Sequence, residues 1–165
     1  MGYGNFGRAG FKVSRLALGL GFRGQTDADE GERAIERAIE LGINVIDCAN
    51  VYGLGDDRVE AGTSEQILGR ALKRHRDDLF ISSKVFSPIG DGPNDRGASR
   101  YHIMREIDRT LGRLDTDHID VYILHGFDDV TPLDETLRAM DDPGTSGKTP
   151  YTRLSHSTTG QSGKN

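Results

Sequence analysis

The segment GINVIDCANVYG, residues 42–53, predicts a short strand that runs into a loop. Its β-branched residues Val45 and Ile46 favour a strand, and residues typical of turns bound them on both sides. Asp47 therefore ends the predicted strand, and Tyr52 follows on the loop. In α/β folds the loops after parallel strands converge on one face of the sheet, where ligands bind and catalysis occurs. Asp47 and Tyr52 are therefore the first candidate site residues.

Two more predicted strands end in a polar residue. The run LFISSK ends in Lys84, and the run IDVYILH ends in His125. Neighbouring strands of a sheet lie about 4.8 Å apart, and the carboxyl ends of parallel strands share one rim. We therefore expect Asp47, Lys84 and His125 to lie along one rim, with Tyr52 within reach.

Helical segments separate these strands. Apolar residues at helical spacing, preceded by polar caps, predict helices that start near Asp27, Thr63, Ser99 and Thr131. Strands and helices alternate, with connections long enough for right-handed crossovers, and this order predicts an α/β fold with a parallel sheet. A complete eight-stranded barrel needs about 250 residues. This chain has 165 residues, so we expect only part of a barrel.

These motifs resemble those of the aldo-keto reductase family. The segments GINVIDCANVYG, ISSKV and LGRLDTDHIDVYILH are similar to its signature motifs and occur in the same order, within a match over about Lys12 to Asp142. The resemblance implies an incomplete TIM-type (β/α)8 barrel of parallel strands in residues 1–142. It also implies that an N-terminal β-hairpin, Met1 to Ser14, crosses the barrel floor.

The activity implied by the resemblance is NADPH-dependent reduction of an aldehyde or ketone to an alcohol, or the reverse oxidation. Tyr52 is then the proton donor to the substrate carbonyl, and His125 hydrogen-bonds the carbonyl oxygen. Lys84 is needed because an isolated phenol is a weak acid at neutral pH. An ammonium about 4 Å from the phenol oxygen stabilises the phenolate by roughly 4 kcal/mol at an effective dielectric constant of about 20. Asp47 orients Lys84.

The cofactor implied by the resemblance is NADPH, with NADH as the alternative. We expect it to contact four residues of this chain: Leu20, Gly21, Asp47 and Ser155. In the family its phosphate contacts come from later strands, beyond the matched segment. The expected partner is a small carbonyl or alcohol substrate. No metal site is expected, because the histidines outside the motifs show no metal-ligand spacing.

Residues 143–165 differ in composition from the rest of the chain. The stretch PGTSGKTPYTRLSHSTTGQSGKN has only Tyr151 and Leu154 as large apolar residues. A strand belongs here in the family, but Pro150 lacks the N–H that a strand ladder needs. We therefore expect a degraded, disordered tail from Pro143 onward.

Two glycine-rich stretches resemble phosphate-binding loops. Gly19, Gly21 and Gly24 form a GxGxxG pattern after a strand, with Asp47 at the distance of a Rossmann ribose acid. The helix cap, however, is Asp27, three residues beyond Gly24, so Gly24 does not lie in the opening turn of the helix, which argues against a Rossmann fold. The stretch GTSGKT at 144–149 lacks the first glycine of a Walker motif, so we reject that interpretation.

Composition narrows the functional classes. A net charge of -5 provides no basic stripe for a nucleic acid, and the single cysteine, Cys48, cannot form an internal disulfide. No apolar run is long enough to cross a membrane. A cytoplasmic protein that binds neither membrane nor nucleic acid is therefore expected. The alternative function is an inactive truncated fragment or an interaction module, in which an open sheet edge pairs with a partner or with a second copy.

Overall fold

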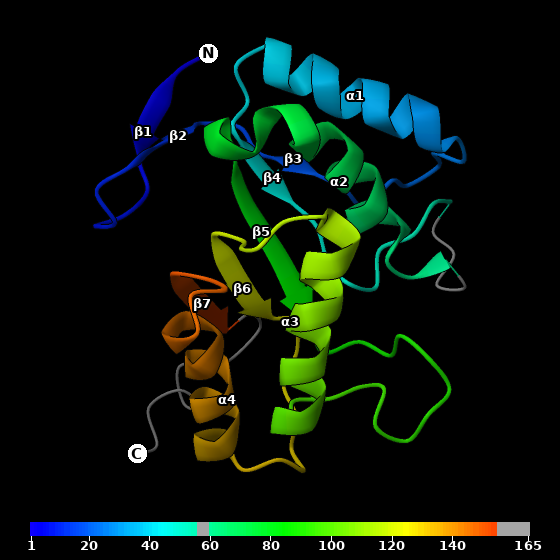
Figure 1. The fold of residues 1–165 in the computed structure, drawn as a ribbon, viewed down its shortest axis with the longest axis vertical. Helices are drawn as coiled ribbons and strands as arrows, with labels where there is room; N and C mark the ends of the chain where they lie inside the picture. The colour runs from blue at the N-terminus through cyan, green and yellow to red at the C-terminus, as the bar shows by residue number, and fades with distance from the viewer. Residues whose placement is uncertain (56–59, 155–165) are drawn as a thin grey trace.

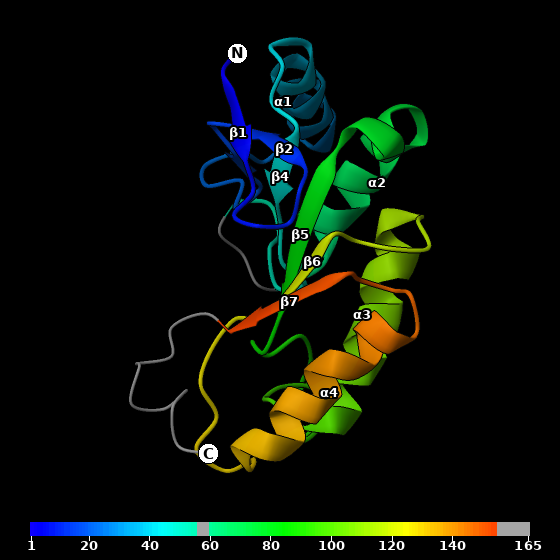
Figure 2. The same ribbon diagram turned by 90° about the vertical axis from the view of Figure 1, so that its left-hand side faces the viewer.

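The computed structural model describes residues 1–55 and 60–154, which form a parallel sheet with helices on one side and a hairpin on the other (Figures 1 and 2). The sheet contains β3 (Leu18–Gly19), β4 (Val45–Asp47), β5 (Phe80–Val85), β6 (Val121–Leu124) and β7 (Tyr151–Leu154), hydrogen-bonded in that order. The helices are α1 (Ala28–Glu40), α2 (Thr63–His75), α3 (Arg100–Leu114) and α4 (Leu133–Thr145), and a 3₁₀ turn, η2 (Arg76–Asp78), follows α2. The hairpin pairs β1 (Tyr3–Asn5) with β2 (Lys12–Ser14).

The order of the strands confirms the predicted fold class. All four pairings within the sheet are parallel, and each strand pairs with the next one along the chain. A helix fills the connection between successive strands, as in a (β/α)8 barrel. The described residues therefore supply five adjacent strands of an incomplete barrel.

Two of the helices start at residues whose side chains cap the first turn. The Asp27 carboxylate accepts hydrogen bonds from two N–H groups in the first turn of α1, and the Ser99 hydroxyl accepts one in α3. The other two predicted caps are wrong by one residue, because Gly62 caps α2 and Pro132 caps α4 rather than the neighbouring threonines. Gly62 has a φ of 91°, a left-handed conformation that favours glycine.

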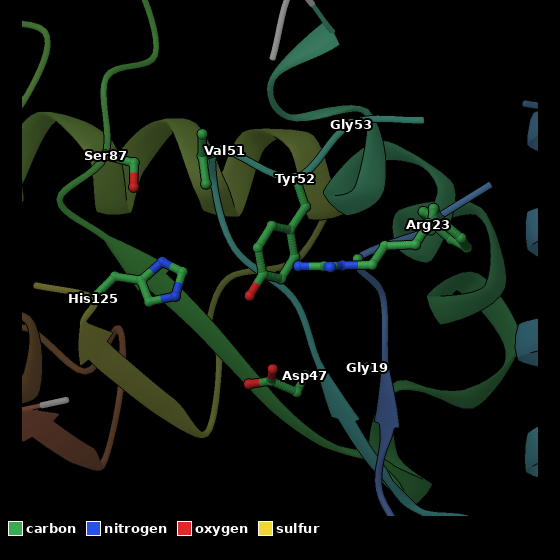
Figure 3. A pocket seen from close by; sticks show the side chains of 10 residues that line it. Gly19, Arg23, Asp47, Val51, Tyr52, Gly53, Ser87 and His125 are labelled. Atoms are coloured by element: carbon green, nitrogen blue, oxygen red, sulfur yellow. The ribbon is translucent and has the colours of Figure 1, made fainter. Parts of the chain in front are cut away.

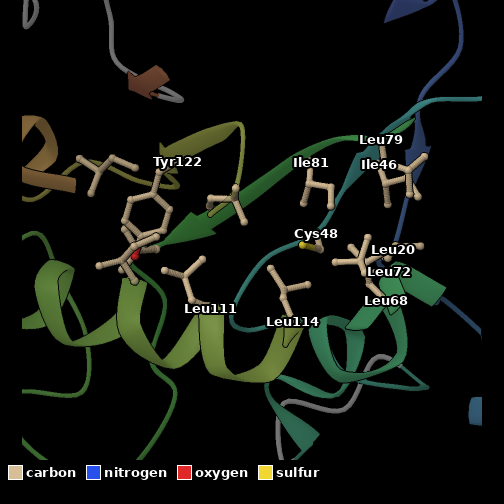
Figure 4. Close-up of a cluster of buried hydrophobic side chains, with 14 of the residues drawn as sticks. Leu20, Ile46, Cys48, Leu68, Leu72, Leu79, Ile81, Leu111, Leu114 and Tyr122 are labelled. Carbon is tan, nitrogen blue, oxygen red and sulfur yellow. The ribbon is translucent and has the colours of Figure 1, made fainter. Parts of the chain in front are cut away.

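The hydrophobic core lies between the sheet and the helices (Figure 4). Residues at alternate strand positions point into it, and the apolar stripes of the helices cover them. The buried side chains include Ile35, Ile46, Ile67, Leu68, Ile81, Ile103, Ile107, Leu114 and Met140. This layer fixes the outer face of each strand, so the residues that alternate with it point to the inner face.

Aromatic side chains close the inner face at the amino ends of the strands. Phe80 begins β5 and Tyr151 begins β7, and both pack against the loop of the hairpin. The Phe11 ring centroid lies 4.6 Å from that of Phe80 and 5.9 Å from that of Tyr151, while Phe6 lies 4.7 Å from Phe80. The expected hairpin thus covers the floor of the sheet, at the end opposite to Asp47 and Lys84.

The expected disordered tail is wrong over residues 143–154. Helix α4 continues through Pro143 to Thr145, and all four residues of β7 pair with β6. Pro150 lies just before the strand, so its missing N–H does not interrupt the ladder. Tyr151 packs in the aromatic floor and Leu154 packs against the core, and this tertiary packing outweighs the low apolar content of the segment. Residues 155–165 lie outside the described residues.

Cys48 should be unreactive in the native protein. It is fully buried, and burial raises the pKa of its thiol, whereas the thiolate is the reactive form. We expect a disulfide reagent such as DTNB to label Cys48 only as fast as the protein unfolds, and to label it rapidly in denaturant. Labelling of one thiol within minutes under native conditions at pH 8 would contradict this packing.

Candidate active site

The side chain of Lys84 is the centre of the site. Its ammonium nitrogen donates hydrogen bonds to Asp47 Oδ2 at 2.5 Å, to the backbone oxygen of Cys48 at 2.8 Å and to Tyr52 Oη at 3.3 Å. Only 8% of the residue is exposed to solvent. The structure therefore brings Lys84 into contact with both Asp47 and Tyr52.

Strand register brings the acid and the lysine together. Asp47 is the last residue of β4 and pairs with Ser82 of β5, so Lys84 lies two residues further along the same face. The Ser82 hydroxyl donates to Asp47 Oδ1 at 2.6 Å. Each oxygen of the Asp47 carboxylate thus has a donor, one from Ser82 and one from Lys84, which fixes the direction of the acid.

The loop after β4 places Tyr52 above this pair. The backbone N–H of Tyr52 donates to the backbone oxygen of Ala49, and the backbone oxygen of Tyr52 accepts from the N–H of Ser64, both at 3.1 Å. The Lys84 ammonium lies 4.7 Å from the centre of the Tyr52 ring. The His125 ring meets the Tyr52 ring edge-on with a centroid distance of 5.9 Å, so all four predicted residues meet at one rim.

A cavity of about 590 Å³ opens at this rim (Figure 3). Asp47, Tyr52 and His125 line it, and Lys84 contacts the first two of these without lining the cavity itself. Its size is typical of small-molecule sites. The cavity is therefore large enough for a small substrate that contacts Tyr52 and His125 together.

The cofactor residues predicted from the sequence have different positions. Gly21 lines the cavity, whereas the Leu20 side chain is buried in the core, so Leu20 could reach a cofactor only through its backbone. Ser155 lies outside the described residues. Arg23 and Ser87 also line the cavity, and the sequence reasoning missed both. Their position in the sequence could have predicted them, because they follow the ends of β3 and β5 as closely as Tyr52 follows the end of β4.

Phe86 and Gly126 link the two strand ends that carry Lys84 and His125. The His125 N–H donates to the Val85 oxygen at 2.8 Å, which extends the β5–β6 ladder. Phe86 has a φ of 151°, and its ring lies against the backbone of Gly126. A Cβ atom at Gly126 would lie 2.5 Å from that ring, so only glycine fits beside His125.

Replacing this glycine should disturb the site. We expect Gly126→Ala to displace the Phe86 ring and to lower the free energy of unfolding by about 1–3 kcal/mol, as overpacking does, measured by urea denaturation. Gly112→Ala is the matched control, because Gly112 lies in the last turn of α3 and a Cβ there meets nothing within 4 Å. That variant should keep or slightly raise the free energy of unfolding, because alanine has the higher helix propensity. Equal effects of the two substitutions would contradict the Phe86 contact.

Asp128 joins the loop that follows β5 to the loop that follows β6. Burial opposes ionisation of its carboxyl, but hydrogen bonds from the N–H groups of Ala98 and Val130 and from the Thr131 hydroxyl outweigh it and lower its pKa. The three donor distances are each 2.9 Å. The charged form of Asp128 therefore holds the loop after β5 against the loop after β6.

This contact predicts a pH dependence of stability. The pKa of Asp128 is lower in the folded than in the unfolded chain, so its contribution is present above the unfolded pKa of about 3.9 and is lost as the pH falls through the folded value. We expect Asp128→Asn to lower the free energy of unfolding by about 1 kcal/mol at pH 7, with a smaller difference at pH 3. The exposed neighbour gives the control, and Asp129→Asn should change stability little at either pH. A difference that stays constant from pH 7 to pH 3 would contradict the assignment.

Two other features, a metal site and a membrane-spanning helix, are not found in the part of the chain that the structure describes. No group of three or more histidine, cysteine, aspartate or glutamate side chains there could hold a metal ion. None of the helices within residues 1–55 and 60–154 is long and apolar enough to span a membrane.

Comparison with known proteins places the chain in a family. It is 40% identical over 159 residues to a Bacillus subtilis protein described as the uncharacterized oxidoreductase YrpG, covering 92% of this chain and 48% of that protein. It is 35% identical to the L-glyceraldehyde 3-phosphate reductase of Escherichia coli K12 (94% and 45% covered). It is 38% identical to a probable voltage-gated potassium channel subunit beta of rice (86% and 42% covered). The chain thus spans about half the length of these relatives.

Solved structures agree with this assignment. The aldo-keto reductase AKR11C1 from Bacillus halodurans superposes with a TM-score of 0.81 at 32% identity, over 94% of this chain and 50% of that one. The thermostable aldo-keto reductase Tm1743 gives a TM-score of 0.80 at 33% identity, over 98% and 56%. The model of the aldo/keto reductase family matches residues 15–163. This chain belongs to the aldo/keto reductase family.

Proposed function

We propose that this chain carries the proton-transfer site of an NADPH-dependent carbonyl reductase. The observation that supports it most directly is the Lys84 ammonium, which hydrogen-bonds Asp47 and Tyr52 at once. Family membership and an oxidoreductase among the relatives support the reaction class. The substrate is a small aldehyde or ketone, or the corresponding alcohol in the reverse direction.

Tyr52 is the proposed proton donor. As the carbonyl carbon is reduced, its oxygen gains negative charge and takes the proton of the Tyr52 hydroxyl, which leaves a phenolate. At 3.3 Å and an effective dielectric constant of about 20, the Lys84 ammonium stabilises that phenolate by roughly 5 kcal/mol before desolvation is counted. Asp47 holds the ammonium in place, so the stabilising charge is positioned before the reaction.

His125 is the proposed orienting residue. Its ring lies edge-on to Tyr52 and lines the same cavity. A carbonyl oxygen placed between these two side chains can accept hydrogen bonds from both, which fixes its direction relative to the Tyr52 proton. Restricting a substrate in this way contributes to catalysis independently of proton transfer.

The cavity fits the nicotinamide end of a dinucleotide. Gly19 and Gly21 border it, and a Cβ atom on either would meet nothing within 4 Å, so the backbone is open to a flat ring at close approach. We propose contacts from the Leu20 backbone, Gly21, Asp47 and Ser155. When bound, NADPH, or NADH as the alternative, supplies the hydride to the carbonyl carbon.

A second candidate function is a binding module without turnover. Rice and Arabidopsis relatives that are 38% and 39% identical are described as probable potassium channel subunits rather than as reductases. Within the described residues β3 and β7 are the outer strands of the sheet, and such edges can pair with another chain. This alternative requires the fold but not the proton chemistry of Tyr52.

The reductase proposal is tested by activity. The chain, and a chimera that joins its residues 1–154 to the remaining strand–helix units of an active family member, are assayed for carbonyl-dependent NADPH oxidation. We expect Tyr52→Phe to lower kcat at least about 100-fold, as loss of a general acid does, and Lys84→Met to lower it comparably.

Tyr101→Phe is the matched control, because Tyr101 is exposed on α3 and does not line the cavity. It should leave kcat unchanged. Activity that is indifferent to Tyr52→Phe would contradict the proposed role. A folded chimera that reduces no carbonyl would favour the binding module.

A further inference from the structure

A cluster of buried charges lies behind the site, between the sheet and helices α2 and α3. The side chains of Glu65 and Glu106 are completely buried, and Arg113 lies between them. Arg113 Nε donates to Glu65 Oε2 at 2.6 Å, and its Nη2 lies 3.6 Å from Glu106 Oε2. We call these three residues the buried ion cluster. The proposed reaction does not use them.

The cluster holds the strand that carries Lys84. The Ser83 hydroxyl donates to Glu65 Oε1 at 2.5 Å. Ser83 immediately precedes Lys84, and successive residues of a strand point to opposite faces. Glu65 therefore binds the outer face of β5 at Ser83, and the side chain of the next residue, Lys84, points to the inner face.

The cluster also holds the loop that carries Tyr52. Asn50 is 1% exposed, and its side-chain nitrogen donates to Glu106 Oε2 at 3.2 Å. The Asn50 N–H donates to the Lys84 oxygen at 3.1 Å, so the same residue contacts both the cluster and β5. Tyr52 follows two residues later and is therefore positioned by a short, doubly held segment.

The turn that opens α2 is shaped by the same cluster. A Cβ atom on Gly62 would lie 2.6 Å from Cδ of Arg113. In the first turn of α2, the N–H of Ser64 donates to the backbone oxygen of Tyr52. The next residue of that turn is Glu65 itself. The loop is thus attached to the cluster before Tyr52, through Asn50, and after it, through α2.

Stability alone explains this arrangement poorly. Desolvating the two carboxylates costs about as much as their attraction to Arg113, and to Arg109, whose Nη1 donates to Glu106 Oε1 at 3.0 Å, returns. Apolar residues often replace such clusters without loss. We propose that Glu65 and Glu106, joined by Arg113, are positioning residues that set Lys84 and Tyr52 at their mutual distance. The catalytic consequence rests on the proposed function, but the geometry is testable without turnover.

The test uses nuclear Overhauser effects in the intact chain. The Tyr52 ring should give cross-peaks to the His125 ring and to the Lys84 side chain, given the 5.9 Å and 4.7 Å separations. We expect Asn50→Leu, which keeps the volume but removes the donor to Glu106, to reduce both cross-peaks to less than half. Unchanged cross-peaks in a folded Asn50→Leu protein would overturn the role of Glu106.

Internal controls separate positioning from general destabilisation. The Phe11–Phe80 contact, with centroids 4.6 Å apart on the floor of the sheet, should be unchanged in Asn50→Leu. Asn44→Leu removes another asparagine side chain with two backbone hydrogen bonds, at Ser14 and Lys12, and should leave the Tyr52 cross-peaks intact.

A second pair of variants decides the outcome if Asn50→Leu fails to fold. Ser83→Ala removes the hydroxyl that binds Glu65 and should weaken the Lys84–Tyr52 cross-peak, whereas Ser83→Thr keeps a hydroxyl and should restore it. Equal cross-peaks in both variants would overturn the role of Glu65. These results do not depend on activity, so a chain that fails the reductase assay can still confirm or contradict the positioning role.

Discussion

A buried ammonium is the constraint on which the rest of the structure depends. Removing a charged lysine from water costs several kcal/mol unless its hydrogen bonds are replaced. Lys84 finds three oxygens, from Asp47, Cys48 and Tyr52, all on β4 or the loop that follows it. A slip of β4 by one residue would turn Asp47 into the core and leave the ammonium without its carboxylate. The register of the sheet and the geometry of the site therefore enforce each other.

The period of two along the strands lets one short segment serve both faces of the sheet. On β5, Lys84 points to the site while Ser83 points to the buried Glu65. At the end of β4, Asp47 faces the site while Cys48, one residue on, is buried in the core. Core packing on the outer face consequently restricts the site on the inner face.

Local patterns in the sequence predicted the helices, the strands of the sheet up to β6 and the four rim residues, because each rests on a few neighbouring residues. The pattern at Val45 and Ile46 is one example. Strand β7 was missed because its stability comes from pairing with β6 and from packing of Tyr151 in the aromatic floor. Both contacts involve residues far away in the sequence, so the local pattern does not predict them. The ion cluster was missed for a similar reason. Glu65 and Arg113 are 48 residues apart, and charged residues on helices normally face water.

The position of the site within the sheet explains how it can form from part of a barrel. Asp47, Lys84 and His125 belong to or directly follow β4, β5 and β6, and β3 and β7 flank these three strands. Each strand that carries a site residue therefore has a hydrogen-bonded neighbour on both sides, and the outer edges fall on strands that carry none of the four. The contacts that fix Tyr52, Lys84 and Asp47 lie within these central strands and the loop after β4. The arrangement of Asp47, Tyr52 and Lys84 is thus a local property of the central strands, and the proposed proton transfer rests on this part of the structure.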